Sequence, residues 1–266
     1  MSVLDKILAA KRDEVTLLHQ PPTRDAIRAA ALAAPAPRDF AGALRRSEHL
    51  AVIAELKRRS PSKGDLAPDL DPAATAAAYA QGGATALSVL TDRVFFGGSV
   101  DDLGQARGAA PHIPVLRKDF TIDTDQVYET LAIGADAILL IVAAVPDDAL
   151  LRDLHDLARD LGLAALVEAH DEAELERALD LGAQIVGVNA RNLATFDEDL
   201  AAVARLAAAI PPNVVAVAES AIRTPADAAQ MANVGFDAVL VGEALVRAED
   251  PAALVRAFAA PARTSR

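Results

Sequence analysis

Residues 51–64 read AVIAELKRRSPSKG, a short apolar run that leads into a cationic loop. An apolar run of this length is typical of a strand that is buried on both faces of a parallel sheet. Glu55 and Lys57 stand two residues apart at its end, so in an extended chain their side chains point to the same side. The loop behind them is rich in basic and turn residues, which suits the binding of an anion or, alternatively, an ordinary basic surface loop.

Similar apolar runs recur along the rest of the chain, and each is followed by a helical pattern. We expect strands at Val52–Glu55, Ala86–Leu90, Pro114–Lys118, Ala137–Ile141, Ala164–Glu168, Ile185–Asn189, Val214–Glu219 and Ala238–Val241. We expect helices at Pro72–Gln81, Val100–Gly108, Thr124–Ile133, Asp147–Leu161, Glu172–Leu181, Asp199–Ala209, Pro225–Val234 and Pro251–Ala259. Strands that alternate with helices form parallel crossovers, and eight consecutive units predict an α/β fold, the TIM (β/α)8 barrel. A doubly wound sheet is the alternative, but the chain has no GxGxxG motif.

A weak internal repeat favours the barrel. The phrases GGATALSV, GADAILLI, GAQIVGVN and GFDAVLVG recur at similar intervals and begin at Gly82, Gly134, Gly182 and Gly235. They mark every second expected strand, and a period of two β/α units is what a quarter-barrel repeat has.

The segment before the first expected strand has helical patterns alone. We expect helices at Ser2–Leu18, Thr23–Ala33 and Asp39–Ser47, with the prolines at positions 21 and 22 ending the first of them. We therefore expect a single barrel domain over residues 1–266, of which residues 1–48 are an N-terminal helical extension.

The composition narrows the class of protein. With 266 residues, of which 52% are hydrophobic, the chain can bury one sizeable core. A net charge of -12 argues against nucleic acid and against an anionic membrane surface as partners, and it makes the cationic loop at residues 57–63 stand out. We expect no nucleic acid and no membrane as a partner, and a chain that is a monomer or a weak homo-oligomer.

Several kinds of chemistry have no support in the sequence. The chain has no Cys, which excludes disulfides, thiol catalysis and Cys-ligated metals, and its five His show no recognised ligand spacing, so we expect no metal. The N-terminus lacks the apolar stretch of a signal peptide, and the longest apolar run, Ala137–Val145, is too short to span a bilayer. We expect a cytoplasmic protein.

Polar residues gather at the ends of the expected strands, where a TIM barrel carries its chemistry. These residues are Glu55, Lys57, Lys118, Glu168, Asn189, Arg191 and Glu219. Because buried charges must pair, opposite charges around one mouth favour acid–base chemistry on a charged substrate, although any single one is also what the end of a strand can carry by chance. Asp119 and His170 stand at the same ends, and we expect them to be solvated or to cap helices.

The loops after the last two expected strands are the usual phosphate site of this fold. They contain Ser220, Ala221, Gly242 and Glu243. Gly242 allows a ligand to approach the backbone closely, unless it is an ordinary turn glycine.

Eight motifs together resemble one known family. They are ELKRRSPSKG from Glu55, LSVLTD and FFGGS between Leu87 and Ser99, VLRKDF from Val115, GADAILLI from Gly134, LVEAH from Leu166, VGVNARNL from Val186 and AESAI from Ala218. They span almost the whole chain in the order of the indole-3-glycerol phosphate synthase family of tryptophan biosynthesis, which the chain resembles. The pair ELKRRSPSKG and KDF is highly specific.

The resemblance implies a carboxy-lyase that needs no metal or organic cofactor. Its reaction is the ring closure of 1-(2-carboxyphenylamino)-1-deoxyribulose 5-phosphate with loss of CO2 and water. By position, Lys118 would protonate the ketone oxygen, and Glu168 would stabilise the cationic intermediate or take a proton later. Lys57 would hold the carboxylate that leaves, or serve as an acid in the dehydration.

The resemblance also implies positions for the rest of the site. Glu55, Asn189 and Arg191 would position the substrate and the lysines, and Phe96 would line the anthranilate pocket. The remaining residues would hold the linker and phosphate: Ser220, Ser60 and the backbone at Ala221, Gly242 and Glu243. The family usually has Gly where this chain has Ala221, so a positive φ there would cost about 1 kcal/mol.

Two other interpretations of the function are possible. Phosphoribosylanthranilate isomerase is a similar barrel, but that family uses a catalytic Cys, which this chain lacks. A catalytically silent barrel that binds phosphorylated ligands is the second, and the presence of Lys57, Lys118 and Glu168 together argues against it.

Overall fold

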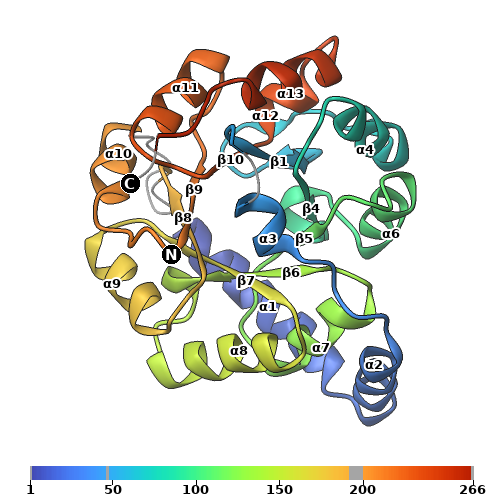
Figure 1. Cartoon of the computed structure of the whole chain (residues 1–266). Helices are drawn as coiled ribbons and strands as arrows, with labels where there is room; N and C mark the ends of the chain where they lie inside the picture. Colours follow the sequence, from blue (N-terminus) through green and yellow to red (C-terminus); the bar gives the residue numbers. More distant parts are fainter. Residues whose placement is uncertain (1, 46–47, 192–199, 265–266) are drawn as a thin grey trace.

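The computed structural model describes residues 2–45, 48–191 and 200–264. Within these residues, eight parallel strands close into a barrel, which confirms the predicted TIM fold (Figure 1). The strands are β1 (Ala51–Leu56), β4 (Ala86–Leu90), β5 (Val115–Lys118), β6 (Ala137–Ile141), β7 (Ala164–Ala169), β8 (Ile185–Asn189), β9 (Val215–Glu219) and β10 (Ala238–Val241). Four of the eight agree with the predicted ranges at both ends, and the others differ by one or two residues.

The barrel closes through β1. Ala51 pairs with Ala238 of β10 on one side, and Ile53 pairs with Ala86 of β4 on the other, both in parallel. All six residues of β1 are buried, as predicted for a strand covered on both faces. Because every neighbouring pair is parallel, all eight C-terminal ends meet at one mouth.

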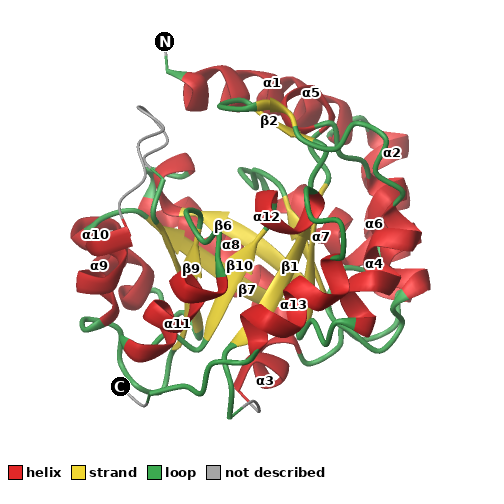
Figure 2. Ribbon diagram, turned by 90° about the horizontal axis from the view of Figure 1, so that it is seen from above, coloured by secondary structure: helices red, strands yellow, loops and turns green. Residues whose placement is uncertain are grey.

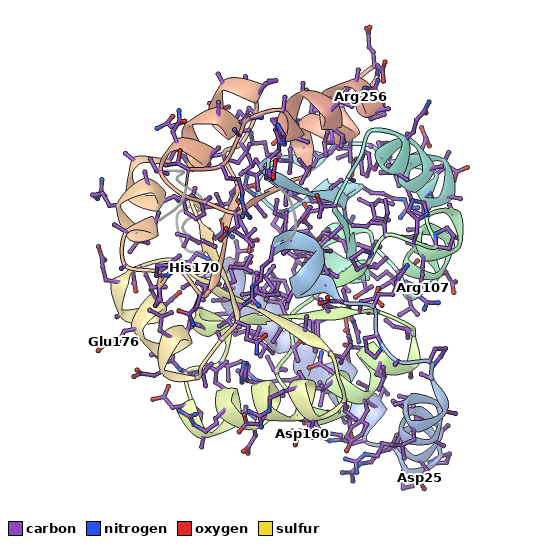
Figure 3. All side chains as sticks on the ribbon, in the orientation of Figure 1. Asp25, Arg107, Asp160, His170, Glu176 and Arg256 are labelled. Carbon is purple, nitrogen blue, oxygen red and sulfur yellow. The ribbon has the colours of Figure 1, made fainter. Side chains whose placement is uncertain are left out.

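A ring of helices surrounds the barrel (Figure 1). The helices are α4 (Pro72–Gln81), α6 (Val100–Ala109), α7 (Thr124–Ala132), α8 (Asp148–Asp160), α9 (Glu172–Asp180), α10 (Leu200–Ala207), α11 (Pro225–Asn233) and α13 (Pro251–Ala259). Asp71, Thr224 and Asp250 accept hydrogen bonds from the first turns of helices that begin with Pro, which is a favourable helix start. Charged side chains such as Asp160, Glu176 and Arg256 project from this ring (Figure 3). No described helix is long and apolar enough to cross a bilayer.

Three helices precede the barrel: α1 (Val3–Leu18), α2 (Pro21–Ala33) and α3 (Phe40–Arg45). Figure 2 shows α1 above the mouth of the barrel and α3 at its opposite end. The predicted start of the second helix at Thr23 was wrong, because Pro21 and Pro22 occupy its first turn, where their missing N–H groups need no partner. The N-terminal segment therefore covers the end at which the polar residues gather.

The sequence prediction missed four short elements. These are α5 (Arg93–Phe96), η1 (Val142–Ala144) and the hairpin of β2 (Arg59–Ser60) with β3 (Gly64–Asp65), whereas the short helix α12 (Glu243–Val246) begins at Glu243 as the phosphate-site pattern predicts. All follow the C-terminal end of a strand. Each of the four missed elements is too short to show a hydrophobic period, so the sequence alone carries no signal for it.

The internal repeat has a structural cause. Gly83, Gly134, Gly182 and Gly235 have φ between 76° and 96°, and each stands between a helix and an even-numbered strand of the barrel. An L-residue with a side chain disfavours this left-handed conformation, whereas glycine adopts it readily. The repeated phrase is thus a repeated helix end followed by a buried strand.

This cause predicts opposite effects of one substitution at two glycines. Gly182→Ala should lower the free energy of unfolding by about 1–2 kcal/mol, because its φ of 76° is left-handed although a Cβ there would meet nothing within 4 Å. Gly104→Ala, inside α6 with equally open space, should raise it by about 0.5–1 kcal/mol. Urea denaturation of both variants measures this, and a shift of the same sign in both would contradict it.

Candidate active site

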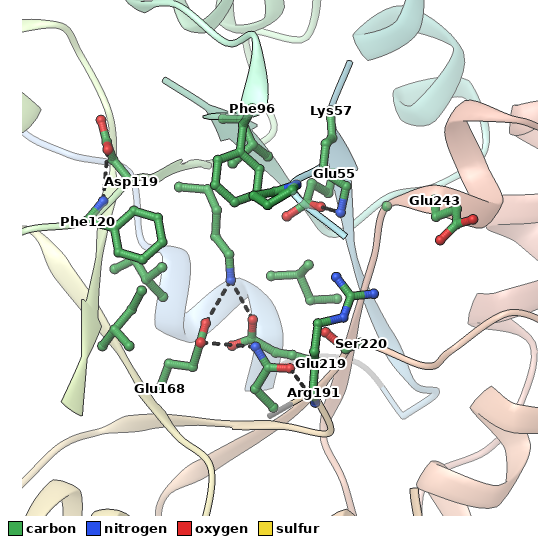
Figure 4. A pocket seen from close by; sticks show the side chains of 18 of the residues that line it. Glu55, Lys57, Phe96, Asp119, Phe120, Glu168, Arg191, Glu219, Ser220 and Glu243 are labelled. Carbon is green, nitrogen blue, oxygen red and sulfur yellow. Dashed lines mark hydrogen bonds and ion pairs between the residues drawn. The ribbon is translucent and has the colours of Figure 1, made fainter. Parts of the chain in front are cut away.

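A cavity opens at the C-terminal mouth of the barrel (Figure 4). Of the predicted site residues, it is lined by Glu55, Lys57, Phe96, Lys118, Glu168, Asn189, Arg191, Ser220, Ala221, Gly242 and Glu243. Ser60 is not among its lining residues. The Ser60 hydroxyl accepts a hydrogen bond from the backbone N–H of Lys63 at 3.2 Å, so a role for Ser60 in phosphate binding stays a prediction.

The ammonium group of Lys118 lies at the centre of the charged residues. Its Nζ donates to Glu168 Oε2 at 2.9 Å and to Glu219 Oε2 at 2.5 Å, and both contacts are drawn in Figure 4. Burial by itself would lower the pKa of Lys118, but the negative charges of Glu168, Glu219 and Glu55 raise it above its ordinary value. Lys118 is therefore a partly buried, protonated lysine at neutral pH.

Glu168 is held on both of its oxygens. Lys118 takes Oε2, and Asn189 donates its Nδ2–H to Oε1 at 3.0 Å, while the Asn189 Oδ1 accepts the backbone N–H of Arg191 at 3.0 Å. Burial by itself would raise the pKa of Glu168, but the charge of Lys118, with His170 and Asn189, holds it well below its ordinary value. Glu168 is therefore a carboxylate with a fixed direction.

Glu219 is the residue that the sequence placed at a strand end but did not select for the site. It is 1% exposed, and burial raises its pKa to about 8, helped by the charge of Glu168 and opposed by Lys118. Its Oε1 makes no hydrogen bond within the described residues. Gly187 of β8 leaves space for this carboxylate, since a Cβ there would lie 2.1 Å from Glu219 Oε1.

Glu55 and Lys57 form the second pair, as their spacing predicted. Lys57 Nζ lies 2.6 Å from Glu55 Oε1. A Cβ on Gly242 would lie 2.4 Å from that carboxylate oxygen and 3.2 Å from the ammonium nitrogen. Gly242 has a φ of -119°, so it is needed for the space that this pair occupies and not for an unusual backbone conformation.

Comparisons with known proteins agree on one family. The model of the family described as indole-3-glycerol phosphate synthase matches residues 4–258. The chain belongs to this family.

Relatives across the whole length support the assignment. The indole-3-glycerol phosphate synthase of Nocardioides sp. (strain ATCC BAA-499 / JS614) is 52% identical, with 96% of this chain and 97% of the relative covered. That of Variovorax paradoxus (strain S110) is 49% identical, with 94% and 96% covered. Among solved structures, 3-hexulose-6-phosphate synthase from Salmonella typhimurium has a TM-score of 0.64 at 16% identity, covering 79% of this chain and 97% of that one, a likeness of fold alone.

In this indole-3-glycerol phosphate synthase family member, Asp119 and His170 are not solvated, so that expectation was wrong. Asp119 is 4% exposed and accepts from Lys11 at 2.8 Å, while Arg117 lies 3.3 Å away. The cause is tertiary, because Asp119, a lining residue of the cavity that directly follows β5, meets Lys11 of α1. His170 lies between two glutamates, Glu168 and Glu174.

Lys11 joins α1 to the rim of the barrel. It is 1% exposed, and its Nζ contacts Asp119 at 2.8 Å, Glu14 at 2.6 Å and Asp92 at 3.4 Å. Burial by itself would lower the pKa of Lys11, but Asp119, Glu14 and Asp92 raise it. The signal in the sequence was a lysine one turn after Ile7, on the apolar stripe of its helix.

The helix that Lys11 fixes forms an apolar wall of the site. Val3, Leu4 and Ile7 of α1 line the cavity together with Phe96 and Phe120, whose ring centroids lie 6.2 Å apart. An apolar wall with aromatic rings suits a flat aromatic group. The predicted place of Phe96 in the cavity is confirmed, whereas the contribution of α1 was not predicted.

The loop after β9 has an unusual backbone conformation. Ser220 and Ala221 after β9 have φ of 64° and 56°, so the left-handed conformation considered for Ala221 is present. Lys63, in the loop after β1, lies 3.2 Å from Glu243 at the start of α12. This ion pair brings the cationic loop next to the loop after β10.

One group outside the cavity has the geometry to hold a cation. Ligand atoms of His19, Asp123 and Asp125 lie within 4.8 Å of one another. Asp125 is already paired with Arg24 at 2.9 Å and Arg28 at 2.7 Å. These two ion pairs tie α2 to α7.

Removal of the Lys11 charge should affect both stability and substrate affinity. Lys11→Met leaves Asp119 and Asp92 without this cation and should lower the free energy of unfolding by about 3–5 kcal/mol. KM should rise because α1 loses its contact with the rim. Lys6→Met, an exposed position on the same helix, is the control and should change neither quantity. A Lys11→Met enzyme with unchanged KM and unchanged stability would contradict the role of Lys11.

Proposed function

We propose that the cavity catalyses the reaction of the family: the decarboxylating, dehydrating ring closure of 1-(2-carboxyphenylamino)-1-deoxyribulose 5-phosphate to indole-3-glycerol phosphate. The observation that carries the proposal is the buried ammonium of Lys118 in the cavity, hydrogen-bonded to two carboxylates. The substrate has an aromatic ring, a carboxylate, a ketone and a phosphate. In the cavity, the apolar wall suits the aromatic ring, and the two lysines suit the carboxylate and the ketone oxygen. The two loops suit the phosphate.

In the first step, Lys118 acts as the general acid. The aromatic carbon that bears the carboxylate attacks the ketone carbon, and Lys118 Nζ gives its proton to the oxygen as the C–C bond forms. Its pairing with Glu168 and Glu219 ensures that Lys118 is protonated when the substrate binds. The same pairing opposes release of the proton from Lys118. Proton transfer to the substrate becomes favourable when one of the two carboxylates is itself protonated or turns toward the developing cation.

The ring closure leaves a positive charge on the substrate. Glu168, held ionised, lies where it can stabilise that charge and accept a proton in the later steps. Lys57 binds the carboxylate that leaves as CO2, in place of its contact with Glu55. Glu55, Asn189 and Arg191 position these groups, and loss of water then completes the aromatic ring.

The phosphate is assigned to the loops after β9 and β10. Ser220, Ala221, Gly242 and Glu243 line the cavity at this end, with backbone N–H groups as the main donors. The cationic loop after β1 lies beside them through the pair between Lys63 and Glu243. Ser60 completes this set in our proposal.

Three further proposals concern the domain, the cellular location and the oligomeric state. We propose one domain over residues 1–266, in which residues 1–48 are a helical extension that supplies α1 to the site. We further propose that the protein works in the cytoplasm as a monomer or a weak homo-oligomer on this small phosphorylated substrate.

A substitution of Lys118 tests the acid. Lys118→Met should lower kcat by at least about 100-fold, the low end for loss of a general acid. Lys118→Arg keeps the charge but cannot give up a proton near neutral pH, so it should lose a similar factor in kcat with a smaller change in KM. The fluorescence of the indole product gives both constants. Turnover like that of the unmodified enzyme in either variant would remove Lys118 from this role.

The phosphate loops make a separate prediction. Ala221→Gly should leave KM equal or lower and raise the free energy of unfolding by about 1 kcal/mol, because it relieves the left-handed φ of 56°. Ala77→Gly, in the exposed face of α4, is the control and should lower the free energy of unfolding by about 0.5–1 kcal/mol. Inorganic phosphate should inhibit competitively. Inhibition that is not competitive would count against the placement of the phosphate.

A further inference from the structure

His170 is a nearly buried residue beside the site that the proposed mechanism does not use. It directly follows β7, two residues after Glu168, and its side chain is 12% exposed. Figure 3 labels it at the edge of the barrel near α9. His170 does not line the cavity, so any effect of its side chain on the reaction passes through another residue.

One side of the imidazole ring is fixed by Glu174 in the first turn of α9. The His170 Nδ1 lies 2.9 Å from Glu174 Oε2, and the backbone N–H of His170 donates to the same oxygen at 2.9 Å. Glu174 is held in turn by its helix, whose N-cap Asp171 accepts the Glu174 backbone N–H at 2.9 Å. The ring therefore has one orientation relative to β7.

The other side of the ring faces Glu168. The His170 Nε2 is buried, lies 3.4 Å from Glu168 Oε1 and has no hydrogen bond within the part of the chain that is described. A neutral imidazole has an N–H on one nitrogen alone, whereas the imidazolium has one on each. Two carboxylates on opposite sides of one ring therefore favour the charged form.

The charges around the ring agree with this. Burial by itself would lower the pKa of His170, but its contacts with Glu168 and Glu174 and the negative charges of both raise it to about 10. Glu168 faces His170 at one oxygen and Lys118 at the other, and Glu219 faces Glu168 across Lys118.

We propose that His170 is a positioning residue, an imidazolium braced by Glu174 that keeps the Glu168 carboxylate ionised and directed at Lys118. This inference rests on the role proposed above for Glu168. It gives the two carboxylates on Lys118 different surroundings, because Glu168 has a cation at each oxygen, whereas among the described residues Glu219 has Lys118 as its one cationic partner. Different surroundings of this kind separate an ionised group from one that holds a proton.

The first test is the pH dependence of the reaction. Glu168 works as a carboxylate, so kcat is lost as the pH falls through its pKa. His170→Gln removes one of its two cations, so that pKa should rise and the acid limb of the kcat profile should move up by about one pH unit. The loss in kcat should grow as the pH falls, while KM changes little.

His155→Gln is the matched control, because His155 is also nearly buried but lies on α8 in the outer ring. It should leave the acid limb where it is. An acid limb that His170→Gln does not move, or moves no further than His155→Gln does, would overturn the proposal.

The second test measures the charge of the ring directly in the full chain. The 15N chemical shifts of His170, assigned by comparison with His170→Gln, should be those of an imidazolium at pH 8, and Glu174→Gln should lower its pKa. A neutral ring at pH 8 would refute the proposal and leave the role of Glu168 intact. Failure of the proposed function would be seen in a different experiment, as a full kcat in the Glu168→Gln variant. That result does not depend on the protonation state of His170.

Discussion

A buried ammonium needs carboxylates, and this need organises the mouth of the barrel. Lys118 ends β5, Glu168 lies near the end of β7 and Glu219 ends β9, so the three charges come from alternate strands of the closed sheet. A buried charge that loses its partner costs several kcal/mol, so the ammonium and the carboxylates must stay together in the empty site. The parallel barrel makes this possible, because it brings all its C-terminal strand ends to one place.

The same need to pair buried charges applies at Asp119, the residue after Lys118. Asp119 meets Lys11 of α1, so a buried lysine joins the N-terminal helix to the rim. One network holds Glu168 and Glu219 at Lys118, and the other holds the apolar wall of Val3, Leu4 and Ile7 over the cavity. A single strand thereby couples the charged half of the site to its apolar half.

Small residues make room for these charges. Gly187 leaves space for Glu219, and Gly242 leaves space for Glu55 and Lys57, since a Cβ at either position would lie within 2.4 Å of a carboxylate oxygen. Ala221, in contrast, takes a left-handed φ without being glycine. The glycines of the site are thus determined by side-chain packing, whereas the repeated glycines at the helix ends are determined by backbone conformation.

The sequence by itself determined the order of strands and helices, the barrel and the polar side chains at the strand ends that line the cavity. These follow from local information: apolar runs, helical periods, caps such as Asp71, and the same-side spacing of Glu55 and Lys57. The partners across the fold could not be derived this way. Nothing in the sequence indicates that Glu219 shares Lys118 with another carboxylate, or that Lys11 contacts Asp119. The sequence also predicts a solvated His170, although its side chain lies between two carboxylates. Only the tertiary structure decided these contacts, because closure of the barrel, and not spacing along the chain, sets which buried charges meet.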